Sequence, residues 1–506
     1  MKFNRTKNTT RTFIFGILYK SLTILGPFVT RTIIIYKLGN EYLGLSSLFT
    51  SVLSILNISE LGIGSAIAFC LYKPVAEDDQ DTIRALLSLL RKLYKYIGVI
   101  IMILGILLLP FLPYFISGTI PPDINIYLLY LLYLFNASAS YFGFAYKGTL
   151  FTVYQRGDVI HKIQFIVDIV RYGVQMIVLI LFSNYYYYTL MLLISTIITT
   201  IATQVVSKKY FPHLYPQGEV NNAMKKTIKS KVLYLSAHSL AAQLTNSVDN
   251  IVISGSLGLA AIGIYGNYNY ITSAVLGMLL IAYQSLTPAI GNSLCSEDRR
   301  NNQKLYNGLH FICFWIIAFC STSIFCLIQP FMKMWVGESN LLSSTVVLMI
   351  TVFYYSNATR QLLTTYVGAA GLWDKTLIRQ ILAAIMNLIL DVLLVKPFGI
   401  SGIVFASFFT NAFVSLPMDI YVTYKYILHD KVMIGLKKEV LNFIVTTIVC
   451  GVTFFLCGLI SNDGIFGLFL KILLCCIVPN VIILIFYYRT DNFRYVRIHL
   501  KNLVQK

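Results

Sequence analysis

Several charged side chains interrupt the long apolar stretches of this 506-residue sequence. They are Lys20, Arg31, Glu60, Asp168, Arg171, Asp249, Arg360, Asp391, Asp419 and Lys471. An ionisable group surrounded by hydrocarbon costs about 3 kcal/mol or more, so it is normally kept only in a water-filled cavity or in a pair with another charge. These residues are therefore the first candidates for binding a charged ligand or carrying an ion.

The basic members of this set could bind an anion, because a guanidinium group matches the oxygens of a phosphate geometrically. The candidate substrate-binding residues are Arg31, Arg171, Arg360 and Lys20. Arg31 follows Gly26 and Pro27, a pair that removes a backbone donor and predicts a break in the first helix. A bend there would turn the guanidinium inward, whereas the alternative is that the side chain snorkels outward to the interface.

Other charged residues have a plain structural alternative. Asp168 and Arg171 are three residues apart on one predicted helix, so they could form an internal ion pair. Lys20, Asp419 and Lys471 lie only about 10 Å from the end of a predicted span. At that depth a lysine can snorkel to the interface and an acid can meet water.

The acids Glu60, Asp249 and Asp391 lie at depth without an adjacent base in the sequence. Burial raises the pKa of a carboxyl toward neutrality, so such acids could carry a coupling proton or bind Na⁺. Asp249 could instead pair with Arg31 across the two halves of the chain. We expect Glu60, Asp249 and Asp391 to be the ion-coupling candidates.

No cofactor or metal site is expected beyond such a coupling H⁺ or Na⁺. The nine cysteines are scattered, mostly within apolar stretches, with no CxxC pair and no histidine at metal-ligand spacing. They are typical of small apolar residues in helix packing. Among the six histidines, only His238 lies at transport depth. The sequence also lacks a phosphate-binding Gly-x4-Gly-Lys-Ser/Thr loop, which excludes an ATPase motor.

The elements that must position these residues are membrane-spanning helices. The composition is 57% hydrophobic and 12% charged, with a mean hydropathy of +0.72, and apolar runs of about 20 residues recur throughout. The sequence thus predicts an all-α integral membrane protein with fourteen transmembrane helices. The predicted spans are 13–37, 42–71, 93–116, 124–147, 160–183, 186–206, 232–256, 262–290, 306–332, 342–366, 378–396, 400–424, 438–460 and 465–488.

The basic residues predict the orientation of these spans. Alternate connections are rich in Lys and Arg, among them Lys208 to Lys231, the pair Lys375 and Arg379, and Lys425 to Lys438. Because basic loops stay inside, we expect both termini in the cytoplasm and an even number of spans. The net charge of +19 is then a topology signal and an attraction to anionic lipids, so no nucleic acid partner is expected.

A short repeat predicts two lobes. Leu38 to Gly44 and Leu257 to Gly263 have the same Leu-Gly-x4-Gly pattern, each in a tight turn between two apolar helices. Glycine suits these turns because they need a positive φ or a close helix approach. We expect an N-lobe of six helices (1–206), a cytoplasmic linker (207–231), a C-lobe of six helices (232–424), and a helix pair with a cytoplasmic tail (425–506). An even number of spans in each lobe makes this a parallel repeat, a pseudo-twofold about the membrane normal.

The motifs together resemble a known family. Besides the two turns, they are the runs Ser59 to Ala66, Val248 to Ser254, and Lys396 to Gly402 with Asn387 upstream. The chain is similar over its whole length to the polysaccharide-transport branch of the multidrug/oligosaccharidyl-lipid/polysaccharide (MOP) exporter superfamily. Within this branch it looks most like the Wzx-type flippases of capsule or O-antigen repeat units.

The resemblance implies a bacterial plasma-membrane flippase with two helix bundles that open alternately to either face. The implied cargo is an oligosaccharide linked to undecaprenyl pyrophosphate, moved from the cytoplasmic to the outer leaflet with ion coupling. Arg31 matches the cavity arginine, Asp249 faces it, and Glu60 matches the acid of the glycine-rich run. Arg171 and Arg360 fit the cavity by depth alone. Implied partners are membrane lipids and the polysaccharide polymerase or export machinery.

Other functions remain open at this point. A membrane glycosyltransferase or polymerase would need large outer loops, whereas the outer connections here have about ten residues or fewer. A drug/cation antiporter of the same superfamily typically stops at twelve spans. A flippase for lipid II or a teichoic-acid precursor shares both the fold and the pyrophosphate chemistry, so the sequence does not exclude it.

Overall fold

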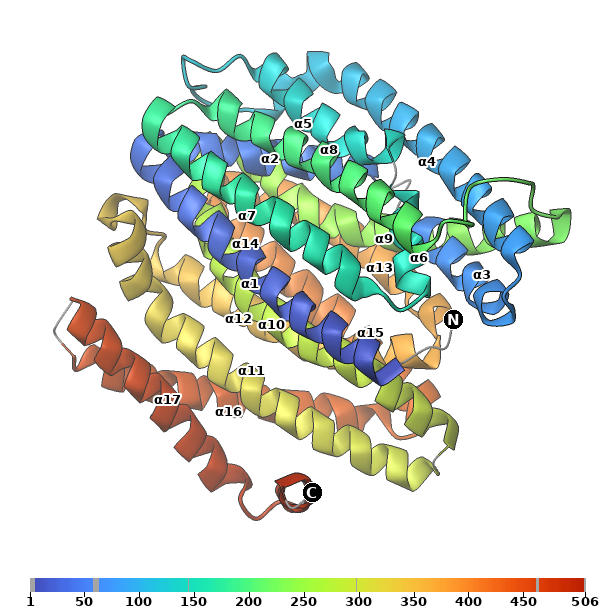
Figure 1. Ribbon diagram of the computed structural model, residues 1–506. Helices are drawn as coiled ribbons and strands as arrows, with labels where there is room; N and C mark the ends of the chain where they lie inside the picture. The colour runs from blue at the N-terminus through green and yellow to red at the C-terminus, as the bar shows by residue number, and fades with distance from the viewer. Residues whose placement is uncertain (1–4, 58–62, 144, 297, 461–463, 505–506) are drawn as a thin grey trace. The chain divides into compact units, whose positions relative to one another are not determined.

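The computed structural model describes residues 5–57, 63–143, 145–296, 298–460 and 464–504. Throughout these residues the regular secondary structure is helical, and no strand occurs in them (Figure 1). The chain divides into two compact units, residues 1–263 and 264–506. The predicted all-α class is therefore confirmed.

Unit 1 contains the helices up to the start of α10. They are α1 (Arg5–Lys37), α2 (Asn40–Leu56), α3 (Ile63–Glu77), α4 (Gln80–Leu108), α5 (Ile126–Phe142), α6 (Tyr146–Val153), α7 (Gly157–Phe182), α8 (Tyr185–Tyr210) and α9 (Asn222–Leu257). α10 (Leu259–Ser296) begins in unit 1 and continues in unit 2. Within unit 1, α7 packs on α1 and α8, and α9 packs on α2 and α3.

Unit 2 is built around α11 and α12, with the last two long helices against α11. Its helices are α11 (Arg299–Val336), α12 (Ser344–Ala370), α13 (Leu377–Phe398), α14 (Ile400–Phe409), α15 (Leu416–Val422), α16 (Val432–Gly458), α17 (Ile465–Tyr487) and α18 (Asp491–Val504). Two π-helical segments flank α15. Thr410–Ser415 joins α14 to α15 in one helical run, and Thr423–Ile427 follows α15. α16 and α17 both pack on α11.

The helices have the length and composition of membrane spans. Among the described residues, ten helices are long and apolar enough to cross a membrane, or eleven if the bent pair α5–α6 is one span. The other three predicted spans, 42–71, 232–256 and 342–366, are helical where the structure describes them. The predicted fourteen spans are consistent with this arrangement, and the chain is a multi-pass membrane protein.

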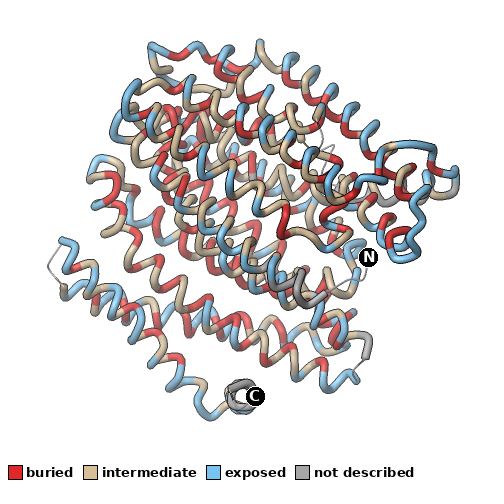
Figure 2. Tube along the Cα trace, in the orientation of Figure 1, coloured by how far each residue is buried: buried red, intermediate tan, exposed pale blue. Residues whose placement is uncertain are grey.

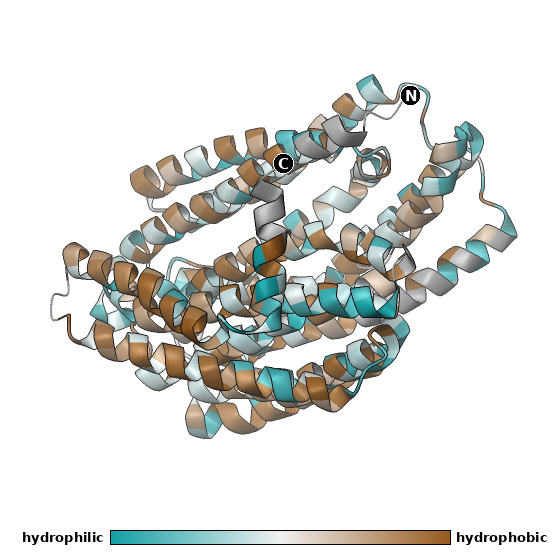
Figure 3. Cartoon of the chain, turned by 90° about the horizontal axis from the view of Figure 1, so that it is seen from below, coloured by the Kyte–Doolittle hydropathy of each residue, from teal (hydrophilic) through white to brown (hydrophobic). Residues whose placement is uncertain are grey.

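The exposed faces of the helices are apolar, as contact with lipid requires. Figure 2 shows exposed residues along the outer helices, and Figure 3 shows that many residues along these helices are hydrophobic. On α17, for example, Ile485 is 72% exposed and Ile477 is 58% exposed. In water such surfaces would aggregate, so they indicate a hydrocarbon solvent.

α9 is less apolar than its neighbours because it carries a polar face toward α2. The Gln243 amide donates to Ser54 Oγ at 2.9 Å and to Ser247 Oγ at 2.8 Å, and the Asn250 amide donates to Ser51 Oγ at 2.9 Å. Hydrogen bonds of this kind hold helices together inside a membrane, where apolar contact alone gives little preference. α9 was predicted to start the second lobe. In the structure it belongs to the same compact unit as the first helices. The predicted lobe boundaries stay a prediction.

The predicted break at Gly26 and Pro27 is wrong, because α1 continues through both residues. Pro27 removes one backbone donor, but the helix is otherwise complete around it, and Thr30 Oγ1 donates to the Gly26 carbonyl at 3.2 Å. Gly26 has a packing role instead. A Cβ added there would lie 2.4 Å from the ring of Tyr172 on α7, so glycine is what allows α1 and α7 to approach.

Both Leu-Gly turns have the backbone conformation that the sequence predicted. Gly39 precedes α2 with a φ of +118°, and Gly258 precedes α10 with a φ of +93°. An L-residue with a side chain rarely adopts such angles, so each turn depends on its first glycine.

The second glycines of the two turns pack the turns against each other. A Cβ on Gly44 would lie 2.1 Å from the carbonyl oxygen of Leu259, and a Cβ on Gly263 would lie 2.2 Å from the carbonyl oxygen of Asn40. All four residues belong to unit 1. The two contacts are equivalent when the turns are aligned, since Gly44 corresponds to Gly263 and Asn40 to Leu259. The predicted close approach is thus confirmed, and it is reciprocal.

Candidate functional site

Unit 1 brings charged and aromatic residues together where α7 packs on α1 and α8. Asp168 and Arg171 form the predicted ion pair on α7, with Arg171 Nη2 3.3 Å from Asp168 Oδ1. Their side chains are only 14% and 16% exposed, respectively. Because these residues are one helical turn apart, the pair is set by local geometry and needs no other element.

Tyrosines surround this ion pair. The Arg171 guanidinium lies 4.3 Å from the centre of the Tyr172 ring, within the range of a cation–π contact. The Tyr19 hydroxyl on α1 hydrogen-bonds Asp168. One turn further along α7, Gln175 donates to the carbonyl of Tyr188 on α8 at 3.1 Å. These contacts link the polar faces of the three helices.

Arg31 belongs to the same neighbourhood. Both Arg31 and Arg171 lie near enough to the Tyr188 hydroxyl to act on it electrostatically. Lys20 and Arg31 are both half-buried, and about three helical turns, or about 16 Å, separate them along one face of α1. The structure therefore places two of the four predicted substrate-binding residues, Arg31 and Arg171, near one tyrosine, whereas Lys20 lies about three turns away along α1. We call Tyr19, Arg31, Asp168, Arg171, Tyr172 and Tyr188 the α1–α7–α8 cluster.

Asp249 lies on α9, next to the residues that bond this helix to α2. It is buried, with an exposed fraction of 9%. Its sequence neighbour Asn250 bonds Ser51 of α2 at 2.9 Å. The predicted acid is thus buried within a polar helix contact, and its ion-coupling role stays a prediction.

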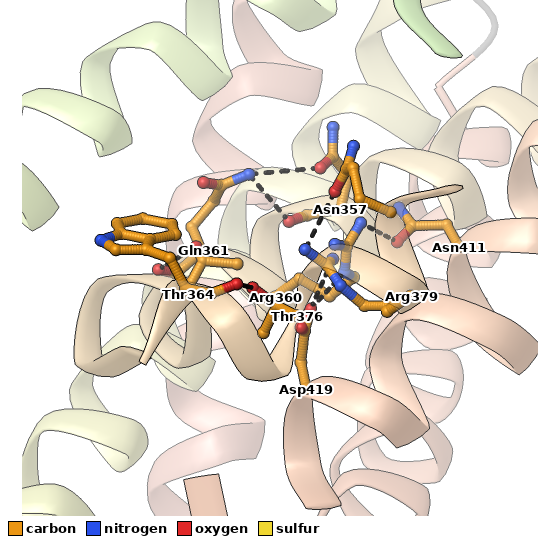
Figure 4. A network of polar contacts seen from close by, with 10 residues as sticks. Asn357, Arg360, Gln361, Thr364, Thr376, Arg379, Asn411 and Asp419 are labelled. Atoms are coloured by element: carbon orange, nitrogen blue, oxygen red, sulfur yellow. Dashed lines mark hydrogen bonds and ion pairs between the residues drawn. The ribbon is translucent and has the colours of Figure 1, made fainter. Parts of the chain in front are cut away.

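In unit 2, Arg360 is part of a buried network with two further charges (Figure 4). Arg360 Nε lies 2.9 Å from Asp419 Oδ2, and Arg379 Nη1 lies 3.1 Å from the same oxygen. Arg360 also donates to Asn411 Oδ1 at 2.7 Å. The Asp419 side chain is fully buried, and Arg379 is 3% exposed. Two guanidinium groups against one carboxylate leave the network with an excess positive charge.

One expectation about this network is wrong. Asp419 does not meet water near a span end, because its side chain is fully buried between arginines supplied by α12 and α13. Arg379, predicted to belong to a basic connection with Lys375, lies buried within the first turn of α13. Arg360, predicted to line a cavity as a substrate-binding residue, is placed in an ion pair.

Amide and hydroxyl side chains flank Arg360 on α12 (Figure 4). Gln361 Nε2 lies 3.2 Å from Asn357 Oδ1, and Thr364 Oγ1 donates to the Gln361 carbonyl at 3.0 Å. These residues were not predicted from the sequence, because their side chains carry no charge. The polar stretch from 356 to 365 within an apolar span was the available signal.

Asp391 is completely buried on α13. Asn387, one turn earlier on the same helix, lies 3.4 Å from Asp391 Oδ1 and bonds Ser407 of α14 at 3.2 Å. Glu60 lies outside the described residues. Both remain predicted ion-coupling residues.

A buried histidine–carboxylate pair was missed. His310 Nε2 on α11 lies 2.7 Å from Glu439 Oε1 on α16, and their side chains are 11% and 10% exposed, respectively. The two residues are far apart in the sequence and each lies near the end of a predicted span, so neither stood out. His238, which the sequence placed at depth, has a side chain outside the described residues.

Comparisons with known proteins agree with this fold. A family model described as "Polysaccharide biosynthesis protein" matches residues 9–294. A lipid II flippase MurJ in an inward closed conformation is 15% identical, with a TM-score of 0.70 over 94% of this chain and 99% of that one. A multidrug resistance MATE family transporter of the MOP superfamily is 14% identical, with a TM-score of 0.63 over 81% and 97%. The MATE transporter VcmN of Vibrio cholerae, in its bent form, is 13% identical with a TM-score of 0.57 over 84% and 98%. No curated protein sequence matches significantly.

The fold is that of multi-pass membrane transporters, and the family and the similar structures are transporters rather than enzymes. The chain belongs to the polysaccharide biosynthesis protein family of the MOP superfamily.

Proposed function

We propose that the protein translocates an oligosaccharide repeat unit linked to undecaprenyl pyrophosphate from the cytoplasmic to the outer leaflet of a bacterial plasma membrane. The observation that carries this proposal is the α1–α7–α8 cluster, where Arg31 and Arg171 both act electrostatically on Tyr188 and Arg171 pairs with Asp168. Two guanidinium groups among tyrosines suit a pyrophosphate that must leave water. The family, described by its role in polysaccharide biosynthesis, supports the sugar part of the cargo.

In this proposal the termini are cytoplasmic and transport proceeds by alternating access. The partners are the lipid-linked glycan, membrane lipids, and the polymerase or export machinery that uses the translocated unit.

Deletion of the protein from its host is the direct test. We expect the lipid-linked oligosaccharide to accumulate on the cytoplasmic face and the surface polysaccharide to disappear, measured by mass spectrometry of extracted lipids. Purified protein in liposomes should move the same lipid between leaflets. If the deletion strain instead accumulates lipid II or a teichoic-acid precursor, the repeat-unit proposal fails. Of these two alternative cargoes, lipid II is the better supported, because a lipid II flippase has a similar fold over 94% of the chain.

We also propose that Asp249 and Asp391 couple transport to a gradient of H⁺ or Na⁺, together with Glu60. Both described acids are buried, and taking up a cation offsets part of the cost of keeping a charged carboxylate away from water. Asp249→Asn and Asp391→Asn should remove the stimulation of lipid translocation by an imposed gradient, while gradient-independent exchange continues. The measurement is translocation in liposomes with and without each gradient.

The matched control is Asp374→Asn, because Asp374 is a half-exposed acid paired with Lys375 in the short helical turn before α13. It should leave the gradient response unchanged. Full stimulation in both the Asp249 and the Asp391 variant would refute their coupling role.

A further inference from the structure

Three buried cysteines of unit 2 meet where α16 and α17 pack on α11. Cys326 of α11 is 5% exposed, Cys457 of α16 is 4% exposed and Cys475 of α17 is 1% exposed. Their sulfur atoms all lie within 4.8 Å of one another. No spacing rule could find this group, because each cysteine comes from a different helix.

The geometry of the group fits a metal ion with three sulfur ligands. At a metal–sulfur distance of about 2.3 Å, three sulfurs around an ion in their plane are about 4 Å apart. The thiols therefore need to move by less than about 1 Å to bind. Among the described residues, no histidine, aspartate or glutamate joins the group. Three thiolates without a fourth ligand suit a soft monovalent ion such as Cu(I) better than Zn²⁺, which is usually four-coordinate.

The surroundings of the three thiols are apolar, with one basic residue nearby. Phe325, Leu327 and Leu474 pack against the three cysteines and exclude water. Each thiol that becomes a ligand gives its proton to solvent, so three thiolates and one Cu(I) leave two negative charges. Lys471 lies one turn before Cys475 and acts electrostatically on Cys457. Its ammonium group can offset one of these charges, which gives a function to a charge otherwise explained only by snorkelling.

We propose that Cys326, Cys457 and Cys475 form a binding site for Cu(I) that ties α16 and α17 to α11. The bound ion replaces thiol contacts by three metal–sulfur bonds between three helices. It therefore restricts any motion of the last two long helices against α11. This proposal does not depend on the identity of the cargo.

The test is Cu(I) binding to the purified, reduced full-length protein in detergent without oxygen. Bicinchoninate serves as the competing chelator, and its coloured Cu(I) complex reports the transfer. We expect the protein to withdraw one equivalent of Cu(I) and to protect three cysteines from alkylation, counted by mass spectrometry. Withdrawal of no copper, or isolation of an intramolecular disulfide among the three cysteines with no metal retained, would overturn the proposal.

Each helix offers its own control cysteine. Cys326→Ala, Cys457→Ala and Cys475→Ala should each lose the bound equivalent, whereas Cys313→Ala on α11, Cys450→Ala on α16 and Cys476→Ala on α17 should keep it. Size-exclusion profiles establish that the variants are folded. If one of them is not, Lys471→Gln provides a test with all three ligands intact, since it should weaken Cu(I) binding relative to Lys471→Arg. Copper retained equally by all six alanine variants would show adventitious binding and refute the site.

Discussion

Replacing Arg31 by alanine is expected to abolish export of the glycan while the protein stays folded and inserted. In the proposed mechanism Arg31 supplies charge-assisted hydrogen bonds to the pyrophosphate, each worth about 1.5–3 kcal/mol. Losing two of them lowers affinity by about 100-fold or more. Export is measured as the ratio of surface polysaccharide to the lipid-linked intermediate that remains inside the cell.

Two further variants separate charge from geometry. Arg31→Lys keeps the charge but not the planar fork, so export should be intermediate. Lys37→Ala removes an exposed positive charge from the last turn of the same helix, and it should export normally. Normal export by Arg31→Ala, in membranes that contain wild-type amounts of protein, would contradict a role for Arg31 in binding cargo.

Asp419→Asn is expected to cause the largest loss of stability. Asp419 is the shared counter-ion of Arg360 and Arg379, and the neutral variant leaves two guanidinium groups facing each other in a buried place. Removing one partner from a buried ion pair costs about 3–5 kcal/mol. The measurement is unfolding in mixed detergent micelles, followed by circular dichroism.

The control for this variant is Asp374→Asn, in which a half-exposed pair with Lys375 is broken. Exposed pairs contribute only about 0–1 kcal/mol, so its unfolding should be close to wild type. Adding Arg379→Met to Asp419→Asn removes one of the two uncompensated charges, and it should recover part of the lost stability. A stability of Asp419→Asn equal to that of Asp374→Asn would show that the network does not hold α12, α13 and α15 together.

The sequence predicted best where the physical signal is local. Apolar runs of spanning length indicated the helices, and the Asp168–Arg171 pair followed from a spacing of one turn. The two glycine-containing turns followed from the special angles and close packing that only glycine permits. Each of these features depends on a few consecutive residues.

Features that join distant segments could not be predicted in the same way. Arg360, Arg379 and Asp419 lie on different helices, so the sequence did not predict that they form one network. His310 and Glu439 were missed for the same reason, as was the sulfur cluster. The Gly26–Pro27 break was wrong because the proline costs one hydrogen bond, whereas the packing of Gly26 on Tyr172 holds α1 in its helical path.

The reciprocal contact of the two turns has a consequence for the origin of the fold. Gly44 lies against the backbone of Leu259, and Gly263 lies against the backbone of the matching Asn40. A contact in which position i meets j and position j meets i is the hallmark of an isologous interface between two identical subunits. The arrangement is the one expected of a half-length ancestor that paired with itself before two gene copies fused. Such an origin would account for matching glycines in both turns next to helices whose charges differ.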